Sequence, residues 1–213
     1  MNKLLVSDNI KINDGSYELD IKSNIVNITV DGNVILYLIN QLLDKLSIEL
    51  IDNSKLIIYK FNKYNENNIE ININQNNSTK LIYNEAIINK EDNKVIINNN
   101  IKGNNNKSEI NIRNISDNNN SDIIINVNIS KNTMNNIALE DLKGINNGGF
   151  IHIEPNIICD SNEVEANHLT TIGSIDEELI SYMNSKGINS NNAKELILKG
   201  FIYSKMDEYI KNN

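Results

Sequence analysis

Single apolar and single polar residues alternate through most of residues 1–168, and this pattern limits the possible folds more than any other feature of the chain. The alternation is clearest over residues 21–30, 69–73, 110–115, 123–129 and 150–153. Neighbouring side chains of a β-strand point to opposite faces, so this spacing is typical of strands with one apolar face. Clusters of Asn, Gly, Asp and Ser separate the runs, as turn residues do. We therefore expect many short strands joined by corners, without helical crossovers.

Two residue types dominate this pattern: 46 of the 213 residues are Asn and 40 are Ile. Isoleucine suits a pleated, half-buried surface, whereas asparagine is favoured at turns and at left-handed backbone positions. Three all-β architectures fit these features, namely a sandwich, a closed barrel and a solenoid of stacked strands. The chain has no strict sequence repeat, and Asp-Gly hairpin signals occur only at 14–15 and 31–32. The pattern alone leaves the sandwich and the solenoid level.

One internal segment departs from the alternation. Its apolar residues recur at intervals of three and four, which predicts an amphipathic helix. The short apolar runs at its edges, 34–36 and 47–51, fit strands equally well. The residues with helical spacing are Ile35, Leu38, Ile39, Leu42, Leu43 and Leu46.

The residue pattern changes again after Gly173, where the alternation stops. Ser174 or Asp176 can cap a helix, acidic residues follow in its first turn, and Gly187 is a natural stop. A second helix is expected from about residue 190 to about residue 210. The sequence thus predicts a β region over residues 1–173 and a helical region over residues 174–213, whose helices could cover the open end of a β stack.

Composition excludes several classes of protein. No apolar run approaches the roughly 20 residues of a membrane-spanning helix, and the N-terminus lacks the apolar stretch of a signal peptide, so we expect a cytoplasmic protein. Cys159 is the only cysteine, which rules out an intrachain disulfide and a four-cysteine metal site. The net charge of −8 and the single arginine, Arg113, argue against nucleic-acid binding. No phosphate-binding loop with its lysine is present, so the chain itself should not hydrolyse ATP.

An ordered set of residues between Pro155 and Phe201 resembles the C-terminal signature of the SufB/SufD family, the scaffold subunits of the SUF iron–sulfur cluster assembly system. The single histidine followed five residues later by a glycine resembles the SufD branch in particular. The matching elements are Val164-Glu165-Ala166 before His168, then Thr171-Ile172-Gly173, Ile175-Asp176-Glu177-Glu178, Tyr182, Ser185-Lys186-Gly187-Ile188, Ala193 and Gly200-Phe201.

The resemblance implies a right-handed parallel β-helix, so the expected fold is all-β with a small α-helical C-terminal tail. Residues 1–173 would form the β-helix core, and residues 174–213 would dock an ATPase. The chain is shorter than typical members, which add a long N-terminal helical region. The implied function is that of a non-enzymatic scaffold subunit that binds the SufC-like ABC ATPase. Its β-helix would pair with a second copy or with a SufB-like subunit. A transient iron–sulfur cluster at the subunit interface is implied, rather than a tightly bound cofactor.

His168 is the candidate ligand for a metal or cluster. Alternation places Val164, Ala166 and His168 on one face of a strand at the end of the β region. A histidine there is either a core residue satisfied by neighbouring backbone groups or an iron ligand at an interface; the resemblance implies the second. Many family members carry a cysteine two residues before this histidine, where this chain has Ala166.

The other candidate residues have simpler interpretations. Cys159 alternates with Ile157 and is expected to be a small buried side chain. No catalytic residue is expected. The resemblance assigns ATPase binding to a set of residues at the start and within the helical tail: Gly173, Ile175, Tyr182, Gly187, Ile188, Gly200 and Phe201.

The alternative function is that of a β-solenoid protein that binds or cleaves carbohydrate. Such a protein would need an exposed groove of aromatic or acidic residues along one face and a signal for export. Aromatic residues make up only 5% of the chain, and tryptophan is absent. This alternative therefore ranks second.

Overall fold

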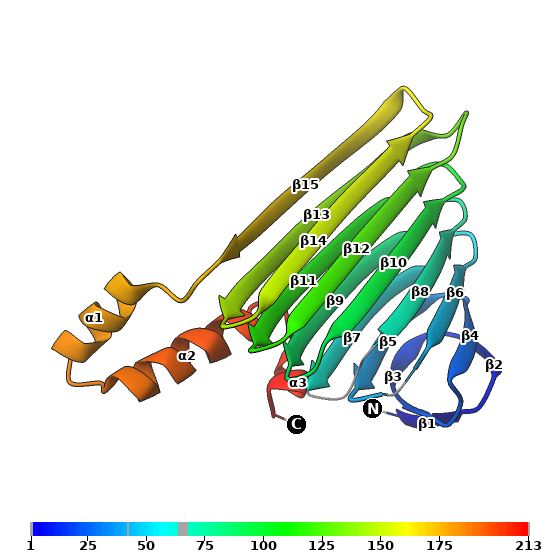
Figure 1. Cartoon of the computed structure of the whole chain (residues 1–213). Coiled ribbons are helices and arrows are strands. Elements are labelled where there is room, and N and C mark those ends of the chain that lie inside the picture. Colours follow the sequence, from blue (N-terminus) through cyan, green and yellow to red (C-terminus); the bar gives the residue numbers. More distant parts are fainter. Residues whose placement is uncertain (1, 42, 64–67, 213) are drawn as a thin grey trace.

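The computed structural model describes residues 2–41, 43–63 and 68–212. In this part of the chain, fifteen strands precede three helices (Figure 1). The strands are β1 (Asn2–Val6), β2 (Asn9–Ile12), β3 (Gly15–Ile21), β4 (Ile25–Val30), β5 (Asn33–Ile39), β6 (Lys45–Leu50), β7 (Lys55–Lys63), β8 (Asn68–Gln75), β9 (Lys80–Asn89), β10 (Asn93–Ile101), β11 (Lys107–Asp117), β12 (Asn120–Ile129), β13 (Met134–Asn147), β14 (Phe150–Cys159) and β15 (Glu163–Gly173). The helices are α1 (Glu177–Ser185), α2 (Ser190–Ile202) and α3 (Glu208–Asn212).

The strands form two parallel sheets between which the chain alternates. Odd-numbered strands β1 to β15 make one sheet in sequence order, and even-numbered strands β2 to β14 make the other. Each strand therefore lies beside the strand two elements earlier, and all the pairs are parallel. This is the coil-upon-coil arrangement of a parallel β-helix, so the predicted solenoid is confirmed and the sandwich with antiparallel layers is excluded.

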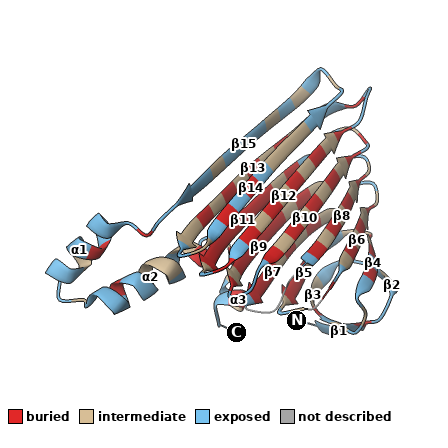
Figure 2. Cartoon of the chain, viewed as in Figure 1, coloured by how far each residue is buried: buried red, intermediate tan, exposed pale blue. Residues whose placement is uncertain are grey.

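Inward-pointing aliphatic side chains stack in columns along the solenoid. Leu46, Ile71, Ile97 and Ile125 occupy matching positions on four successive even strands, and each is 0% exposed. Burying such a side chain contributes about 1.5–3 kcal/mol, so each coil stabilises the next through its column. Figure 2 shows the result as alternating buried and partly buried positions along the central strands.

Asparagine serves the outer face and the corners. On the outside of the even sheet, the amides of Asn98, Asn126 and Asn156 each donate to the asparagine of the preceding coil, at 2.8–3.1 Å. Such amide ladders satisfy side-chain polar groups along stacked parallel strands. Other asparagines adopt positive φ angles, which they tolerate better than most residues. Among them are Asn53, Asn105, Asn118 and Asn132, with φ of 66°, 59°, 61° and 62°.

The prediction of a helix over residues 35–46 is wrong. Strands β5 and β6 occupy most of this segment, and Leu42 lies outside the described residues. Val34, Leu36 and Leu38 alternate into the core, where Val34 and Leu36 lie beside inward residues of β7. Columns shared with neighbouring strands outweigh the local three-and-four spacing, since most helical stability comes from tertiary packing.

The tail begins as predicted and then differs. The Asp176 carboxylate accepts from the backbone of Glu178 and Leu179 at the start of α1, and Gly187, with φ of 87°, follows its end. The predicted second helix is interrupted, because α2 ends at Ile202 and α3 begins only at Glu208. Between them, the Ser204 hydroxyl donates to the Phe201 carbonyl, as at a helix end.

The tail does not cover the open end of the solenoid, in contrast to the expected cap. Helix α1 and the start of α2 project away from the sheets, while the end of α2 and α3 lie against the odd strands (Figure 1). The contact is an apolar cluster, and Tyr37 donates a hydrogen bond of 2.5 Å to Asp207. None of the helices in the described part of the chain is long and apolar enough to cross a membrane. The buried residues of the cluster are Tyr37, Phe61, Ala86 and Ile115 from the sheet and Ile202, Met206 and Ile210 from the tail.

Candidate functional site

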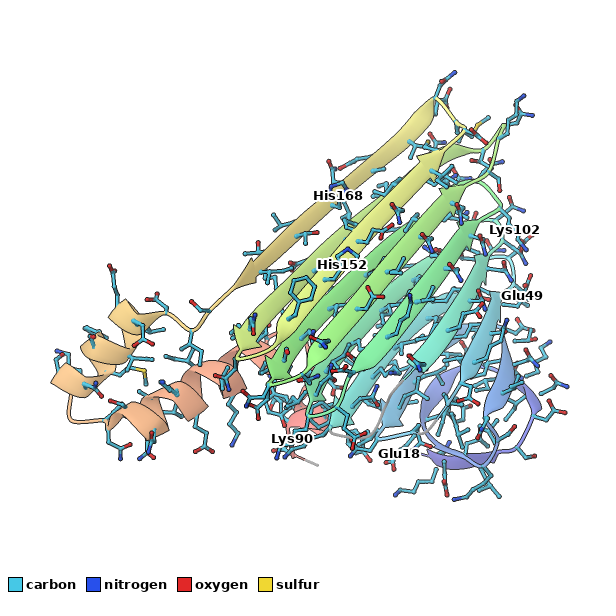
Figure 3. The ribbon with its side chains drawn as sticks, in the orientation of Figure 1. Glu18, Glu49, Lys90, Lys102, His152 and His168 are labelled. Atoms are coloured by element: carbon cyan, nitrogen blue, oxygen red, sulfur yellow. The ribbon has the colours of Figure 1, made fainter. Side chains whose placement is uncertain are left out.

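The end of the solenoid at β15 is the strongest candidate for a functional site. Strand β15 is the last in the odd sheet and pairs only with β13 among the described residues. Val164 and Ala166 pack against the core, and His168 follows them on the same face, as predicted. No later coil of the described chain covers this end, so His168 is exposed even though it occupies an inward position on β15 (Figure 3).

Glu140 lies next to His168 on the preceding coil. The two residues are register partners on β13 and β15. The Glu140 side chain is inward, between Ala138 and Leu142, and its residue is only 4% exposed. Neither of its carboxylate oxygens has a hydrogen-bond partner among the described residues. Burial raises the pKa of Glu140 to about 7, because desolvation disfavours the charged form.

Sequence reasoning missed Glu140, although a signal was present. In the stretch Ala138-Leu139-Glu140-Asp141-Leu142, alternation places Glu140 on the same strand face as the apolar residues Ala138 and Leu142. A buried carboxylate without a partner is costly, so it calls for an explanation beyond packing.

Together, Glu140 and His168 offer a carboxylate oxygen and an imidazole nitrogen on strands about 4.8 Å apart. Both ligand types suit iron. The described residues contain no group of three or more His, Cys, Asp or Glu side chains that could hold a metal ion.

Glu140 also makes the stability of the protein depend on pH. Its pKa rises from the ordinary value of 4.5 to about 7 on folding, so its effect on stability is absent below pH 4.5. As the pH rises towards 7, ionisation is increasingly favoured in the unfolded state, and the folded state loses stability. We expect the stability of Glu140→Gln relative to the wild type to increase by about 3 kcal/mol between pH 4.5 and pH 8. Urea unfolding at both pH values measures this; an equal difference at both would contradict it.

The other candidate residues near this end lie apart from the Glu140–His168 pair. His152 points outward from β14, in the other sheet, where its Nδ1 lies 2.7 Å from Asp122 Oδ1. The prediction that Cys159 is buried is wrong, since this residue is exposed. It continues the inward column of Ile101 and Ile129, but it ends the last even strand, so no further coil covers it.

The predicted ATPase-binding residues fall into two packing groups. Ile175 is buried with Ile188 packed beside it under α1 and α2, whereas Phe201 packs against the solenoid. Tyr182 is 60% exposed. The backbones of Gly173, Gly187 and Gly200 are open: apart from their chain neighbours and, for Gly200, the backbone of its own helix, no atoms lie within 4 Å of the position of a Cβ.

Sequence reasoning missed two further apolar side chains that the tail leaves uncovered. Leu179 on α1 is 40% exposed and Leu196 on α2 is 51% exposed. With Tyr182 they give the projecting part of the tail three large exposed apolar side chains. We call these three residues the tail patch.

Comparison with known proteins adds one finding. The family model described as "SUF system FeS cluster assembly, SufBD core domain" matches residues 43–201, which include most of the solenoid, Glu140, His168 and helix α1. A search of curated proteins found no match to the chain.

Proposed function

Because the chain belongs to the SufB/SufD family of SUF iron–sulfur cluster assembly, we propose that it is a non-enzymatic scaffold subunit of that system. Its family membership confirms the resemblance found in residues 155–201. The observation that carries the proposal is the placement of Glu140 beside His168 at the uncovered end of the solenoid. Iron or a cluster would be the cargo of this site rather than a resident cofactor.

The uncovered edge of β15 supports pairing with a second chain. An edge strand has unpaired backbone groups that another strand can use. Natural edges are often protected by lysine or proline, and β15, with the sequence EVEANHLTTIG, contains neither. Leu169 and Ile172 on this strand are 56% and 44% exposed, which gives a partner apolar surface to cover. A second copy of the chain or a SufB-like subunit would bury this edge and supply the missing iron ligands.

The tail supports docking of the SufC-like ABC ATPase. Its projecting part is anchored at one end by contacts of α2 and α3 with the sheet, so it can receive a partner without leaving the solenoid. The tail patch provides the apolar and aromatic anchors on which interfaces usually depend.

Co-expression with a SufC-like ATPase tests the proposal. We expect the ATPase to co-purify with the wild-type chain. Tyr182→Ala combined with Leu196→Ser should weaken binding by more than about tenfold, since an aromatic anchor is often worth over 1.4 kcal/mol. Leu5→Ser is the matched control, because Leu5 is 66% exposed on β1, far along the stack from the tail patch. Failure of the wild type to bind the ATPase, with or without ATP, would count against the scaffold role.

The carbohydrate function is not favoured. It requires aromatic side chains along an open groove. The aromatic rings found in contact with one another, including Tyr37, Tyr59 and Tyr209, are instead packed between the tail and the sheet.

A further inference from the structure

Arg113, the single arginine of the chain, ties the tail to the solenoid. It lies on the outer face of β11, and its residue is only 3% exposed. Its Nε donates to Ser204 Oγ at 3.1 Å, in the link between α2 and α3. Ser204 is held in turn by the Phe201 carbonyl at the end of α2. The guanidinium is therefore bonded directly to the tail just after the end of α2.

The two terminal nitrogens of the same guanidinium form hydrogen bonds with Asp141 on β13. Nη1 donates to the Asp141 carbonyl at 2.9 Å, and Nη2 donates to Asp141 Oδ2 at 2.6 Å. Both the backbone and the side chain of Asp141 are thus fixed by one planar group, a geometry that lysine cannot reproduce. Asp141 directly follows Glu140, whose register partner is His168.

A surface hollow of about 310 Å³ lies beside Asp141. Its lining includes Lys205 from the tail, Asp141, Glu140 and His168. Lys205 Nζ lies 3.5 Å from Asp141 Oδ2. Arg113 and Lys205 thus link the tail to Asp141. Asp141 follows Glu140 in the chain, and Glu140 is the register partner of His168.

We propose that Arg113 is a positioning residue that couples the tail to the Glu140–His168 pair. A displacement of the tail at Ser204 moves the guanidinium, which moves the Asp141 backbone and with it Glu140 and the neighbouring His168. An event at the tail, such as partner docking, is thereby transmitted to the end of the solenoid. The proposal rests on the proposed function only in taking Glu140 and His168 as the site.

The chain offers a simple reporter for this coupling, because it contains only two histidines. The ¹H–¹³C NMR signals of the imidazoles can be assigned with His152→Gln and His168→Gln. The spectra are recorded at one pH, about two units above the usual histidine pKa, so that shifts report the environment rather than protonation. His152 lies on the other sheet beside Asp122 and serves as the internal control.

Ser204→Ala removes one exposed hydroxyl, and with it the tail's hydrogen bond to Arg113 and the hydrogen bond to the Phe201 carbonyl within the tail. We expect it to shift the His168 signal and leave the His152 signal in place. In an Arg113→Lys background, the same Ser204→Ala change should shift His168 about threefold less, because the route is already broken. Arg113→Met, which removes every guanidinium hydrogen bond, provides a second interrupted background if Arg113→Lys does not fold.

An unmoved His168 signal in Ser204→Ala would overturn the coupling, whatever the interrupted backgrounds show. An equal shift with and without Arg113 would also overturn it, because the effect would then pass through Lys205 and the hollow. Neither iron nor the ATPase is in the sample. Failure of this test therefore leaves the scaffold role standing, and failure of ATPase or iron binding leaves the coupling standing.

Discussion

Replacing Glu85 alone with leucine is expected to lower the free energy of unfolding by about 3–5 kcal/mol. Glu85 and Lys60 are register partners on β9 and β7, and both point into the solenoid. Lys60 Nζ lies 2.6 Å from Glu85 Oε1, and both side chains are 0% exposed. The Tyr83 hydroxyl donates to the other carboxylate oxygen at 2.7 Å. The single change removes the carboxylate and leaves the ammonium group in a medium that solvates it poorly.

The double variant Lys60→Met with Glu85→Leu is the matched control. It removes both charges and keeps similar volumes, and such replacements are often neutral or stabilising. We expect its stability to lie within about 1 kcal/mol of the wild type, apart from the cost of the Tyr83 hydroxyl that loses its acceptor. Urea unfolding followed by circular dichroism compares the variants. If Glu85→Leu alone were as stable as the double variant, leaving the Lys60 ammonium group without the Glu85 carboxylate would carry no cost in stability, and the prediction would be wrong.

The strand content could be predicted from the sequence, but the neighbours of each strand could not. Alternation of Ile with Asn specifies which side chains share a face, as Val164, Ala166 and His168 do. It does not specify which coil a strand stacks on, and Lys60 meets a residue 25 positions later. The family resemblance, rather than the pattern, distinguished the solenoid from the sandwich.

The errors have a common physical cause, which is that local patterns do not report what covers a residue. Cys159 has the correct inward position, but the stack ends there and leaves it exposed. Residues 35–46 have helical spacing, but columns shared with the neighbouring strands hold β5 and β6 extended. The tail caps at Asp176 and Gly187 were predictable because capping depends on a few adjacent residues.

The largest functional effect is expected for iron binding at the end of the solenoid. In the proposed iron site, His168 and Glu140 each supply one ligand, and the described residues offer no third ligand beside them. We propose that the complete site forms when a partner chain covers β15. Losing a direct ligand should cost at least as much as losing a group that merely orients one, which is about 10–100-fold in metal affinity.

The placement of iron at this end of the solenoid is tested by anaerobic ferrous iron titration of the chain co-purified with a SufB-like subunit and a SufC-like ATPase. We expect the wild-type complex to bind iron, and His168→Ala and Glu140→Gln each to weaken binding by at least about tenfold. His152→Ala, which removes the other imidazole, should bind iron like the wild type. Iron binding that is unchanged in His168→Ala and Glu140→Gln, or reduced equally in His152→Ala, would contradict the placement of the iron site at the end of the solenoid.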